Sequence, residues 1–515
     1  MAEVSRTARV IQNAKVALFF YCINLILQFF SRKIFLDYLG AELLGLNTTA
    51  QNLLQFLNLA ESGIGAAVAF ALYKPLSQKN KQEIIDIVSL QGWFYRWVGM
   101  FVIAGSIVLM AFFPWIFAKA DVPLIYAYGT FVAFLISALL GYFVNYKMIV
   151  LSADQKEYKI TIETQSIKAI KIFIQLFMIS TFSHGYLWWM SLETIAAVIT
   201  AIRLTRCIKK EYPWLSTSTS RGKQVKEQYS FLLTKTKQLF FHKIGAFALG
   251  QVTPLLIYGF TTLTTVAVYG NYMLIMAGCS MLVEAVSQGL KAGIGNLVSK
   301  GDQSAIKRTF WQIISIRLFI ASFLCSGFFL LSESFVTLWV GREYVMPVVP
   351  MVLMVASYFI QMSRTCEFFL NAYGLFQDIW APVVEATLNI FFSFLLGYFF
   401  GLSGVFIGVL ISQLIVVNGW KAIFLYKWGF NEDLRKFIVP YTKKMILVFS
   451  LQIGVCSLCN SIFKDAESFC DWIGQGALFT FFYLSIGIVF FYFFDKDFRG
   501  IFFKLKGLLF GKRRE

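Results

Sequence analysis

Polar side chains recur at helical spacing within two apolar segments near the start of the chain. Asn24, Gln28 and Arg32 follow one another at intervals of four residues, which places all three on one face of a helix. The next segment extends the pattern with Asn47, Gln51, Gln55, Asn58 and Glu61. Polar stripes on apolar helices predict a cavity lining or contacts between helices.

Charged residues also occur in several later apolar segments. Lys168 and Lys171 share a helix face because they are three residues apart. The candidate cations as a group are Arg32, Lys168, Lys171, Lys243 and Arg317. Since ammonium and guanidinium groups bind phosphate well, this group predicts an anionic cargo. The acids in apolar segments, each costly there and therefore a functional candidate, are Glu61, Glu284 and Glu385.

Each of these candidates also has a structural interpretation. Arg32, beside Lys33, could extend to the lipid headgroups, and Lys291 could anchor the end of its helix. Glu61 could form an ion pair with Arg32, and Glu385 could make a buried hydrogen bond between helices. The sequence leaves both interpretations open.

The composition places these residues in a membrane protein. Apolar types make up 58% of the 515 residues and charged types 14%, a balance that is unusual for soluble domains. Charge-free runs of about twenty residues can cross ~30 Å of hydrocarbon as helices. They predict an all-α integral membrane fold with fourteen spanning helices, at residues 14–36, 43–72, 85–117, 124–147, 160–182, 186–207, 236–259, 264–297, 307–331, 346–374, 378–400, 404–427, 441–461 and 473–495.

Two apolar runs, 244–283 and 386–420, are too long for a single crossing and must turn, and a third, 172–192, contains a turn as well. Glycine permits the positive φ that tight turns require, so glycine-containing stretches are the expected positions. We expect turns at residues 183–185, 259–262 and 401–404.

The basic residues are distributed unevenly between alternate loops. With the N-terminus in the cytoplasm, 36 of the 46 basic residues fall in cytoplasmic loops, Arg364 among them, and five in outer loops. This bias predicts a multi-pass membrane protein with both termini cytoplasmic. Contact with anionic lipid headgroups accounts for the net charge of +18, so no nucleic-acid partner is expected.

Several classes of enzyme lack the residues they need. The chain has two histidines, His184 and His242, which excludes a histidine-rich metal site and leaves little histidine acid–base chemistry. It has no GxxxxGK[ST] phosphate loop, so ATP is not expected as a direct energy source. No loop is long enough for a soluble catalytic domain. The sequence therefore predicts a protein that is not an enzyme and has no metal or other cofactor.

Short motifs along most of the chain resemble the Wzx-type polysaccharide flippases. In the first half they are RKIF (32–35), YLGAELLGL (38–46), LAESGIG (59–65) and LYKPL (72–76). In the second half they are VAVYGNY (266–272), AGIGN (292–296) and LWVGREY (338–344). Through them the chain is similar to the multidrug/oligosaccharidyl-lipid/polysaccharide (MOP) exporter superfamily.

The resemblance implies two pseudo-symmetric six-helix lobes with two additional C-terminal helices. A Gly-Ile-Gly tripeptide late in the second and eighth predicted helices agrees with such a duplication. The expected regions are an N-lobe of helices 1–6 at 1–207, a cytoplasmic basic linker at 208–235, a C-lobe of helices 7–12 at 236–427, helices 13–14 at 428–495 and a basic cytoplasmic tail at 496–515.

The function that the resemblance implies is the movement of an undecaprenyl-pyrophosphate-linked oligosaccharide from the inner to the outer leaflet by alternating access. The candidate cations would hold the pyrophosphate, and the candidate acids would couple transport to a proton or sodium gradient. The position of Arg32 matches the family's cationic residue in the first helix. Expected partners are the lipid-linked glycan, membrane lipids and the polysaccharide polymerase machinery.

Other functions have distinguishable signatures. A cation-drug exporter of the same superfamily would favour acidic rather than basic cavity residues. A lipid II-type flippase would keep the mechanism and change the sugar head. A membrane polysaccharide polymerase, from a different class, would need a large outer loop, whereas the predicted outer loops near 332–345 and 462–472 are short.

Overall fold

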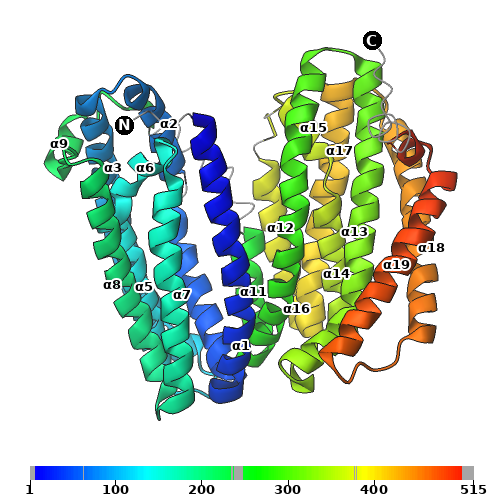
Figure 1. Ribbon diagram of the computed structural model, residues 1–515, viewed down its shortest axis with the longest axis horizontal. Helices are drawn as coiled ribbons and strands as arrows, with labels where there is room; N and C mark the ends of the chain where they lie inside the picture. Colours follow the sequence, from blue (N-terminus) through cyan, green and yellow to red (C-terminus); the bar gives the residue numbers. More distant parts are fainter. Residues whose placement is uncertain are drawn as a thin grey trace. The chain divides into compact units, whose positions relative to one another are not determined.

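The computed structural model describes residues 6–61, 63–232, 236, 248–375, 377–378 and 380–501. The described chain is almost entirely helical (Figure 1). It divides into two compact units, residues Met1–Ala267 (unit 1) and Val268–Glu515 (unit 2), with the division inside α12 (Leu263–Ser299). The N-lobe, linker and C-lobe boundaries expected from the sequence stay predictions.

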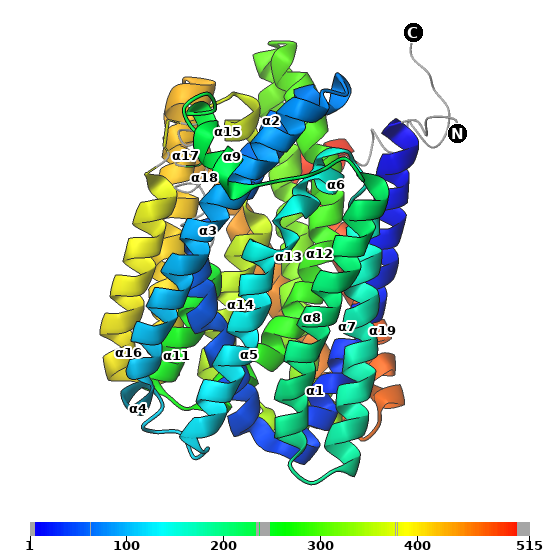
Figure 2. The same cartoon turned by 90° about the vertical axis from the view of Figure 1, so that its left-hand side faces the viewer.

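Unit 1 begins with the long helix α1 (Arg6–Asn58), which kinks at Gly40, where φ is +81°. The remaining elements are η1 (Leu59–Glu61), α2 (Ile64–Ser77), α3 (Lys81–Ala111), α4 (Phe113–Ile116), α5 (Leu124–Phe143), η2 (Asn145–Met148), α6 (Ile149–Ala153), α7 (Glu157–Thr181), α8 (Gly185–Glu211), α9 (Thr219–Gln224), η3 (Ala248–Val252) and α11 (Thr253–Phe260). Helices α5, α7 and α8 run side by side (Figure 2).

Unit 2 is arranged around α13 (Gln303–Trp339), which packs against α14 (Val348–Ser363), α18 (Arg435–Ile462) and α19 (Phe469–Phe494). Its other elements are η4 (Arg342–Tyr344), α15 (Cys366–Ala372), α16 (Ala381–Gln413), η5 (Leu414–Trp420), α17 (Lys421–Phe424) and η6 (Leu425–Phe430). The segments η5 and η6 are π-helical and flank the short α-helical turn α17.

The three expected turns are confirmed. α7 ends at Thr181 and α8 begins at Gly185, and α11 ends at Phe260 before α12 begins at Leu263. Within α16 the chain reverses at Gly401, where φ is +55°. After the reversal, a Cβ on Gly404 would lie 1.9 Å from the Leu396 carbonyl oxygen, so only glycine permits this close antiparallel packing.

Two helices expected to be continuous are interrupted. The predicted helix at 43–72 breaks at η1 and at Gly63, whose φ of 101° is left-handed. The predicted helix at 346–374 breaks at Arg364 and Thr365, between α14 and α15. Polar residues stand at both breaks, Glu61 and Ser62 at the first and Arg364 and Thr365 at the second, but long apolar stretches flank them, so each segment was predicted as one helix.

Nine helical segments in the described part of the chain are long and apolar enough to cross a membrane. Two of them, Gln12–Asn58 and Ala381–Phe430, contain the non-helical residues Gly40 and Gly401, so each consists of two merged helices. The fold is therefore that of an all-α, multi-pass membrane protein. The count of fourteen crossings stays a prediction, because the predicted seventh helix falls partly outside the described residues.

Segments predicted on one side of the membrane meet at one end of unit 1. Asn13, near the start of α1, donates to the Gln155 carbonyl oxygen at 3.1 Å and accepts from the Tyr158 backbone at 2.9 Å. Lys156 pairs with Asp154 at 2.8 Å and with Glu211, the last residue of α8, at 3.4 Å. The start of α1, the α6–α7 junction and the end of α8 thus lie together, as the alternation of loops requires.

Part of the expected linker packs against α3. Arg221 forms an ion pair with Asp86, and the Ser218 backbone donates to the Ser89 hydroxyl at 3.2 Å. A Cβ on Gly222 would lie 2.2 Å from the Ser89 carbonyl oxygen, so the glycine permits this contact. Residues 218–224 therefore have a defined place on unit 1.

Candidate functional site

Glu61 lies at the break between α1 and α2, where it contacts tyrosine. The Tyr95 hydroxyl donates to Glu61 Oε1 at 2.8 Å, and the Tyr142 hydroxyl donates to Asn58 Oδ1 at 2.8 Å. The two tyrosine rings meet edge to face with centroids 5.6 Å apart. A carboxylate that accepts from a neutral hydroxyl can take up a proton without losing an ion pair.

The alternative that Glu61 pairs with Arg32 is not what the structure has. Arg32 Nη2 donates to the Ala267 carbonyl oxygen at 2.9 Å. Among the described residues, no basic side chain lies within ion-pair distance of Glu61. α1 also approaches the start of α12 at Gly45, where a Cβ would lie 2.0 Å from the Leu263 carbonyl oxygen.

Lys168 and Lys171 lie on one face of α7, as expected, but in different surroundings. Lys171 Nζ is 2.6 Å from Glu193 Oε1 on α8, and the Gln175 amide donates to the same oxygen at 3.0 Å. Lys168 makes no hydrogen bond or ion pair with the residues that the structure describes, and it is half-buried. Lys168 is therefore available to a ligand in a way that Lys171 is not.

The remaining polar residues of the first two predicted helices are divided between internal contacts and open positions. Asn24, 7% exposed, donates to Gln165 Oε1 on α7 at 2.8 Å. Asn47 accepts from the Tyr186 hydroxyl of α8 at 3.1 Å. Of the other three residues, Gln28 and Gln55 are half-buried and Gln51 is exposed. Asn24 and Asn47 thus hold α1 against α7 and α8.

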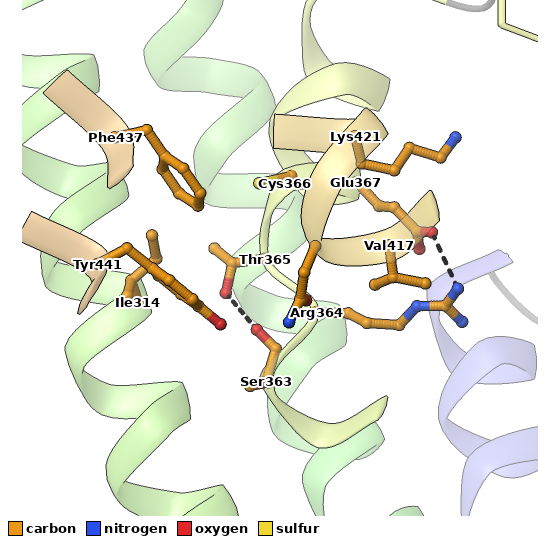
Figure 3. Close-up of a pocket in the computed structure, with 11 residues that line it drawn as sticks. Ile314, Ser363, Arg364, Thr365, Cys366, Glu367, Val417, Lys421, Phe437 and Tyr441 are labelled. Atoms are coloured by element: carbon orange, nitrogen blue, oxygen red, sulfur yellow. Dashed lines mark hydrogen bonds and ion pairs between the residues drawn. The ribbon is translucent and has the colours of Figure 1, made fainter. Parts of the chain in front are cut away.

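In unit 2 the candidate acid Glu385 is paired. It is 4% exposed, and Arg364 Nη2 lies 3.2 Å from its Oε1 and 3.3 Å from its Oε2. Arg364 also approaches Glu367 at 3.6 Å, as Figure 3 shows. Lys421 Nζ lies 2.7 Å from Asp378 Oδ2. Glu385 therefore makes the buried hydrogen bond between helices that its structural interpretation expects, here as an ion pair with Arg364 at the break between α14 and α15.

A small cavity adjoins this cluster. Its volume is about 20 Å³, room for about one water molecule. The polar residues in its lining are Ser363, Arg364, Thr365, Glu367, Asn418, Lys421 and Tyr441 (Figure 3). The break between α14 and α15 creates this arrangement, because it exposes polar backbone and side chains in the middle of an otherwise apolar segment.

Arg317 and Glu284 are also in unit 2, and Arg317 contacts residues on both sides of the break between α14 and α15. Arg317 is 7% exposed, donates to the Ser287 hydroxyl at 2.9 Å and to the Met362 carbonyl oxygen at 2.7 Å, and stacks over Phe368. Glu284, largely exposed, pairs with Lys291 at 2.6 Å. Arg317 is thus held by protein groups. Lys243 lies outside the described residues.

A second buried ion cluster joins α13, α18 and the end of α19. Lys444 Nζ lies 2.7 Å from Asp495 and 2.9 Å from Asp497, and it donates to the Ser315 hydroxyl at 2.8 Å. Lys444 is 7% exposed and Asp495 4%. This cluster shares no residue with the predicted site and fastens the last two helices to α13.

Sequence reasoning missed several partners that define these environments. They are Tyr95, Tyr142, Gln165, Glu193, Asp378 and Lys421. The contact between Arg364 and Glu367 could have been predicted from the sequence, because the two residues are three positions apart in one predicted helix. Among the residues described, no group of three His, Cys, Asp or Glu side chains could hold a metal ion.

The fold is similar to solved transporter structures. One is described as lipid II flippase MurJ in an inward closed conformation, with 15% identity, a TM-score of 0.65 and coverage of 93% of this chain and 99% of that chain. Another is an inward-facing multidrug resistance MATE family transporter of the MOP superfamily, with 12% identity, a TM-score of 0.57 and coverage of 80% and 96%. No protein-family model and no curated protein sequence matches the chain.

These comparisons show that the chain shares its fold with two solved structures that are described as transporters. At 15% and 12% identity the similarity concerns the fold, and the resemblance to the Wzx-type flippases stays a prediction.

Proposed function

We propose that this protein is a flippase that moves an undecaprenyl-pyrophosphate-linked oligosaccharide across a bacterial inner membrane by alternating access. One observation carries the proposal: the fold is similar to that of a lipid II flippase over 93% of this chain and 99% of that chain. The similarity therefore extends over nearly the whole length of both chains.

The intramembrane groups support an anionic cargo. Lys168 is a half-buried cation with no partner in the described part of the chain, so its charge is left to a ligand. An ammonium group in such a position gains most from a charged oxygen such as a pyrophosphate oxygen. Lys171 would position the α7 face through Glu193. Arg32 remains a second proposed ligand, whereas the packing of Arg317 assigns it a supporting role.

We propose Glu61 and Glu385 as alternative coupling groups. Glu61 accepts from tyrosine, so protonation would change one hydrogen bond. Glu385 is bound to Arg364, so protonation would release a buried cation. Either protonation would shift the equilibrium between two conformations of a transporter. The free-energy cost would be small for Glu61 and large for Glu385. Glu284 is mostly exposed and already paired, which weakens its case.

The matched flippase favours one rival cargo, lipid II itself. Both cargoes join a polyprenyl pyrophosphate to a sugar, so the proposed contacts are the same. The decisive experiment deletes the gene and identifies the lipid-linked species that accumulates on the cytoplasmic leaflet. Accumulated oligosaccharide repeat units support the proposal, accumulated lipid II assigns the rival, and neither species accumulating rejects both.

The proposed orientation has a separate test. Ser218 and Ser468 are both exposed, and the charge bias assigns them to opposite sides of the membrane. In a cysteine-free background, Ser218→Cys should react with an impermeant maleimide only in inverted vesicles, and Ser468→Cys only in intact cells. Labelling of both positions from the same side would contradict the arrangement of fourteen crossings.

A further inference from the structure

A second cavity lies in unit 1, away from the groups proposed to bind cargo. Its volume is about 480 Å³, within the range of sites for small ligands. It is formed where α5 ends, by η2, by the last turns of α8 and by the chain that follows α8. The helices that frame it, α5 and α8, pack side by side (Figure 2).

The charge of this cavity is one-sided. Lys147 and Lys209 both belong to its lining, and the lining contains no carboxylate. Neither lysine forms an ion pair with a described residue. The acids closest along the chain, Asp154 and Glu211, are already paired with Lys156, and Glu211 also pairs with Lys159.

The surroundings of the Lys147 ammonium group favour a bound anion. Burial, and then repulsion from Lys209, lowers the pKa of the Lys147 ammonium group. Lys147 lies in η2, outside the long helices, and its ammonium group is near the ring of Tyr146. An anion between the two lysines would remove the repulsion and stabilise both charges.

The apolar part of the lining indicates where the anion comes from. Phe143, Val144 and Ile208 contribute hydrocarbon surface, and Tyr212 adds an aromatic face. The cavity lies at the ends of two helices long enough to span a membrane, which is the level of lipid headgroups. A phosphate bound there would keep its glycerol and acyl portions against apolar protein surface and lipid.

We propose that the cavity between the end of α5 and the last turns of α8 binds the phosphate-bearing headgroup of an anionic phospholipid. Lys147 and Lys209 hold the phosphate, and the wall formed by Phe143 and Ile208 contacts the glycerol and the first acyl carbons. This lipid is distinct from the transported cargo, so the site does not depend on the cargo proposed above.

The test measures phosphatidylglycerol binding to the full-length protein in detergent by native mass spectrometry, with phosphatidylcholine as the zwitterionic reference of zero net charge. The variants are Lys147→Gln, Lys209→Gln, the double Gln variant and the double Arg variant. Lys210→Gln is the matched control, because Lys210 is an exposed neighbour that does not line the cavity. Far-UV circular dichroism and a single elution peak verify that each variant is folded.

Each Gln substitution should weaken phosphatidylglycerol binding about fivefold, because a lysine near an anionic lipid contributes ~1 kcal/mol and ~1.4 kcal/mol is tenfold. The affinity of the double Gln variant for phosphatidylglycerol should fall about 25-fold if the effects of the two substitutions are additive. The double Arg variant and Lys210→Gln should stay within about twofold of wild type, and phosphatidylcholine binding should not change.

Three results would overturn the proposal. They are wild-type phosphatidylglycerol affinity in the double Gln variant, equal losses in Lys209→Gln and Lys210→Gln, and no preference of the wild-type protein for phosphatidylglycerol over phosphatidylcholine. A further arm distinguishes a free phosphate ester from a lipid. Displacement of phosphatidylglycerol by glycerol 3-phosphate at comparable concentration would assign the cavity to a soluble ligand and reject the lipid.

Discussion

Two candidate groups in unit 1, Glu61 and Lys168, have different surroundings from two buried charged groups in unit 2, Glu385 and Lys444. In unit 1, Glu61 accepts from Tyr95, and Lys168 has no partner in the described chain. In unit 2, Glu385 is paired with Arg364, and Lys444 with two aspartates. Charges balanced within the protein mainly fix helix positions, whereas those left to hydroxyl groups or to no partner can change protonation or bind a ligand at lower cost.

The largest expected effect is on the stability of unit 2. Lys444→Met removes the cation from a cluster in which Asp495 is 4% exposed. Because the aspartate would be left charged and buried, the free energy of unfolding should fall by ~3–5 kcal/mol. The midpoint of thermal unfolding in detergent measures this loss, and the exposed neighbour variant Lys443→Met is the control. Equal midpoints for the two variants would show that the cluster is not structurally important.

The next prediction separates the two lysines of α7. Lys171→Gln breaks the 2.6 Å contact with Glu193 and should lower the free energy of unfolding by ~1.5–3 kcal/mol. Lys168→Gln has no such contact to lose, so its stability should be near wild type. For transport we expect the larger loss in Lys168→Gln. Loss of one charged hydrogen bond to the cargo should weaken cargo binding about ten- to hundredfold.

Surface polysaccharide at matched protein levels reports that transport. Lys168→Arg and Lys171→Arg test whether charge alone is required, since each preserves the cation. A Lys168→Gln variant with normal stability and normal polysaccharide would remove Lys168 from the cargo site, and the contrast between the two lysines would then have no functional meaning.

A smaller structural effect is expected at Glu61. The amide oxygen of Glu61→Gln can still accept from the Tyr95 hydroxyl, so the free energy of unfolding should change by less than ~1 kcal/mol. If Glu61 carries the coupling proton, gradient-driven transport in proteoliposomes should nevertheless be abolished. Full transport by the variant would leave Glu385 as the remaining buried candidate, and Glu385→Gln would be measured in parallel.

The smallest effect is a pH dependence outside the membrane spans of unit 2. The hydrogen bond from Lys307, at 2.8 Å, holds the pKa of the Glu432 carboxyl below its usual value. Since the folded-state pKa is lowered, this pair stabilises the fold above the unfolded-state pKa of ~4.3, and the contribution is lost as pH falls through the folded-state value.

Lys307→Gln should therefore flatten the fall in unfolding free energy below about pH 4.3, with a difference under ~1 kcal/mol at neutral pH because the pair is near the surface. Parallel unfolding curves for the variant and wild type across that range would contradict the assignment. The comparison with Lys444→Met calibrates how much burial matters to an ion pair in this fold.

Residue patterns predicted the helical fold because its main determinants are local. Gly259 and Gly401 marked turns, and charge-free runs marked spans, since length, hydropathy and backbone freedom depend on neighbouring residues. The break at Gly63 was missed because Glu61 was assigned to a polar stripe on a continuous helix. The break at Arg364 was missed because the helix predicted at 346–374 was carried through that charge.

The candidate site was predictable in composition but not in pairing. Lys171, Glu61 and Glu385 stood out because a charge in an apolar helix is costly. Their partners are far along the chain: Glu193 follows Lys171 by 22 residues, and Tyr95 follows Glu61 by 34. Helical periodicity predicts which residues share a face of a helix. It does not predict which other helix packs against that face, so the polar partners cannot be assigned from the sequence.

The π-helical stretches around Lys421 affect how that lysine is aimed. A wider turn delays rotation about the helix axis, so residues after η5 emerge in a direction that a count of ~3.6 residues per turn does not give. Conversion of one such turn to α-helical pitch would swing Lys421 by roughly 100°, one residue's rotation, away from Asp378. The additional residue in the π-helical turn therefore determines the direction in which the Lys421 side chain points.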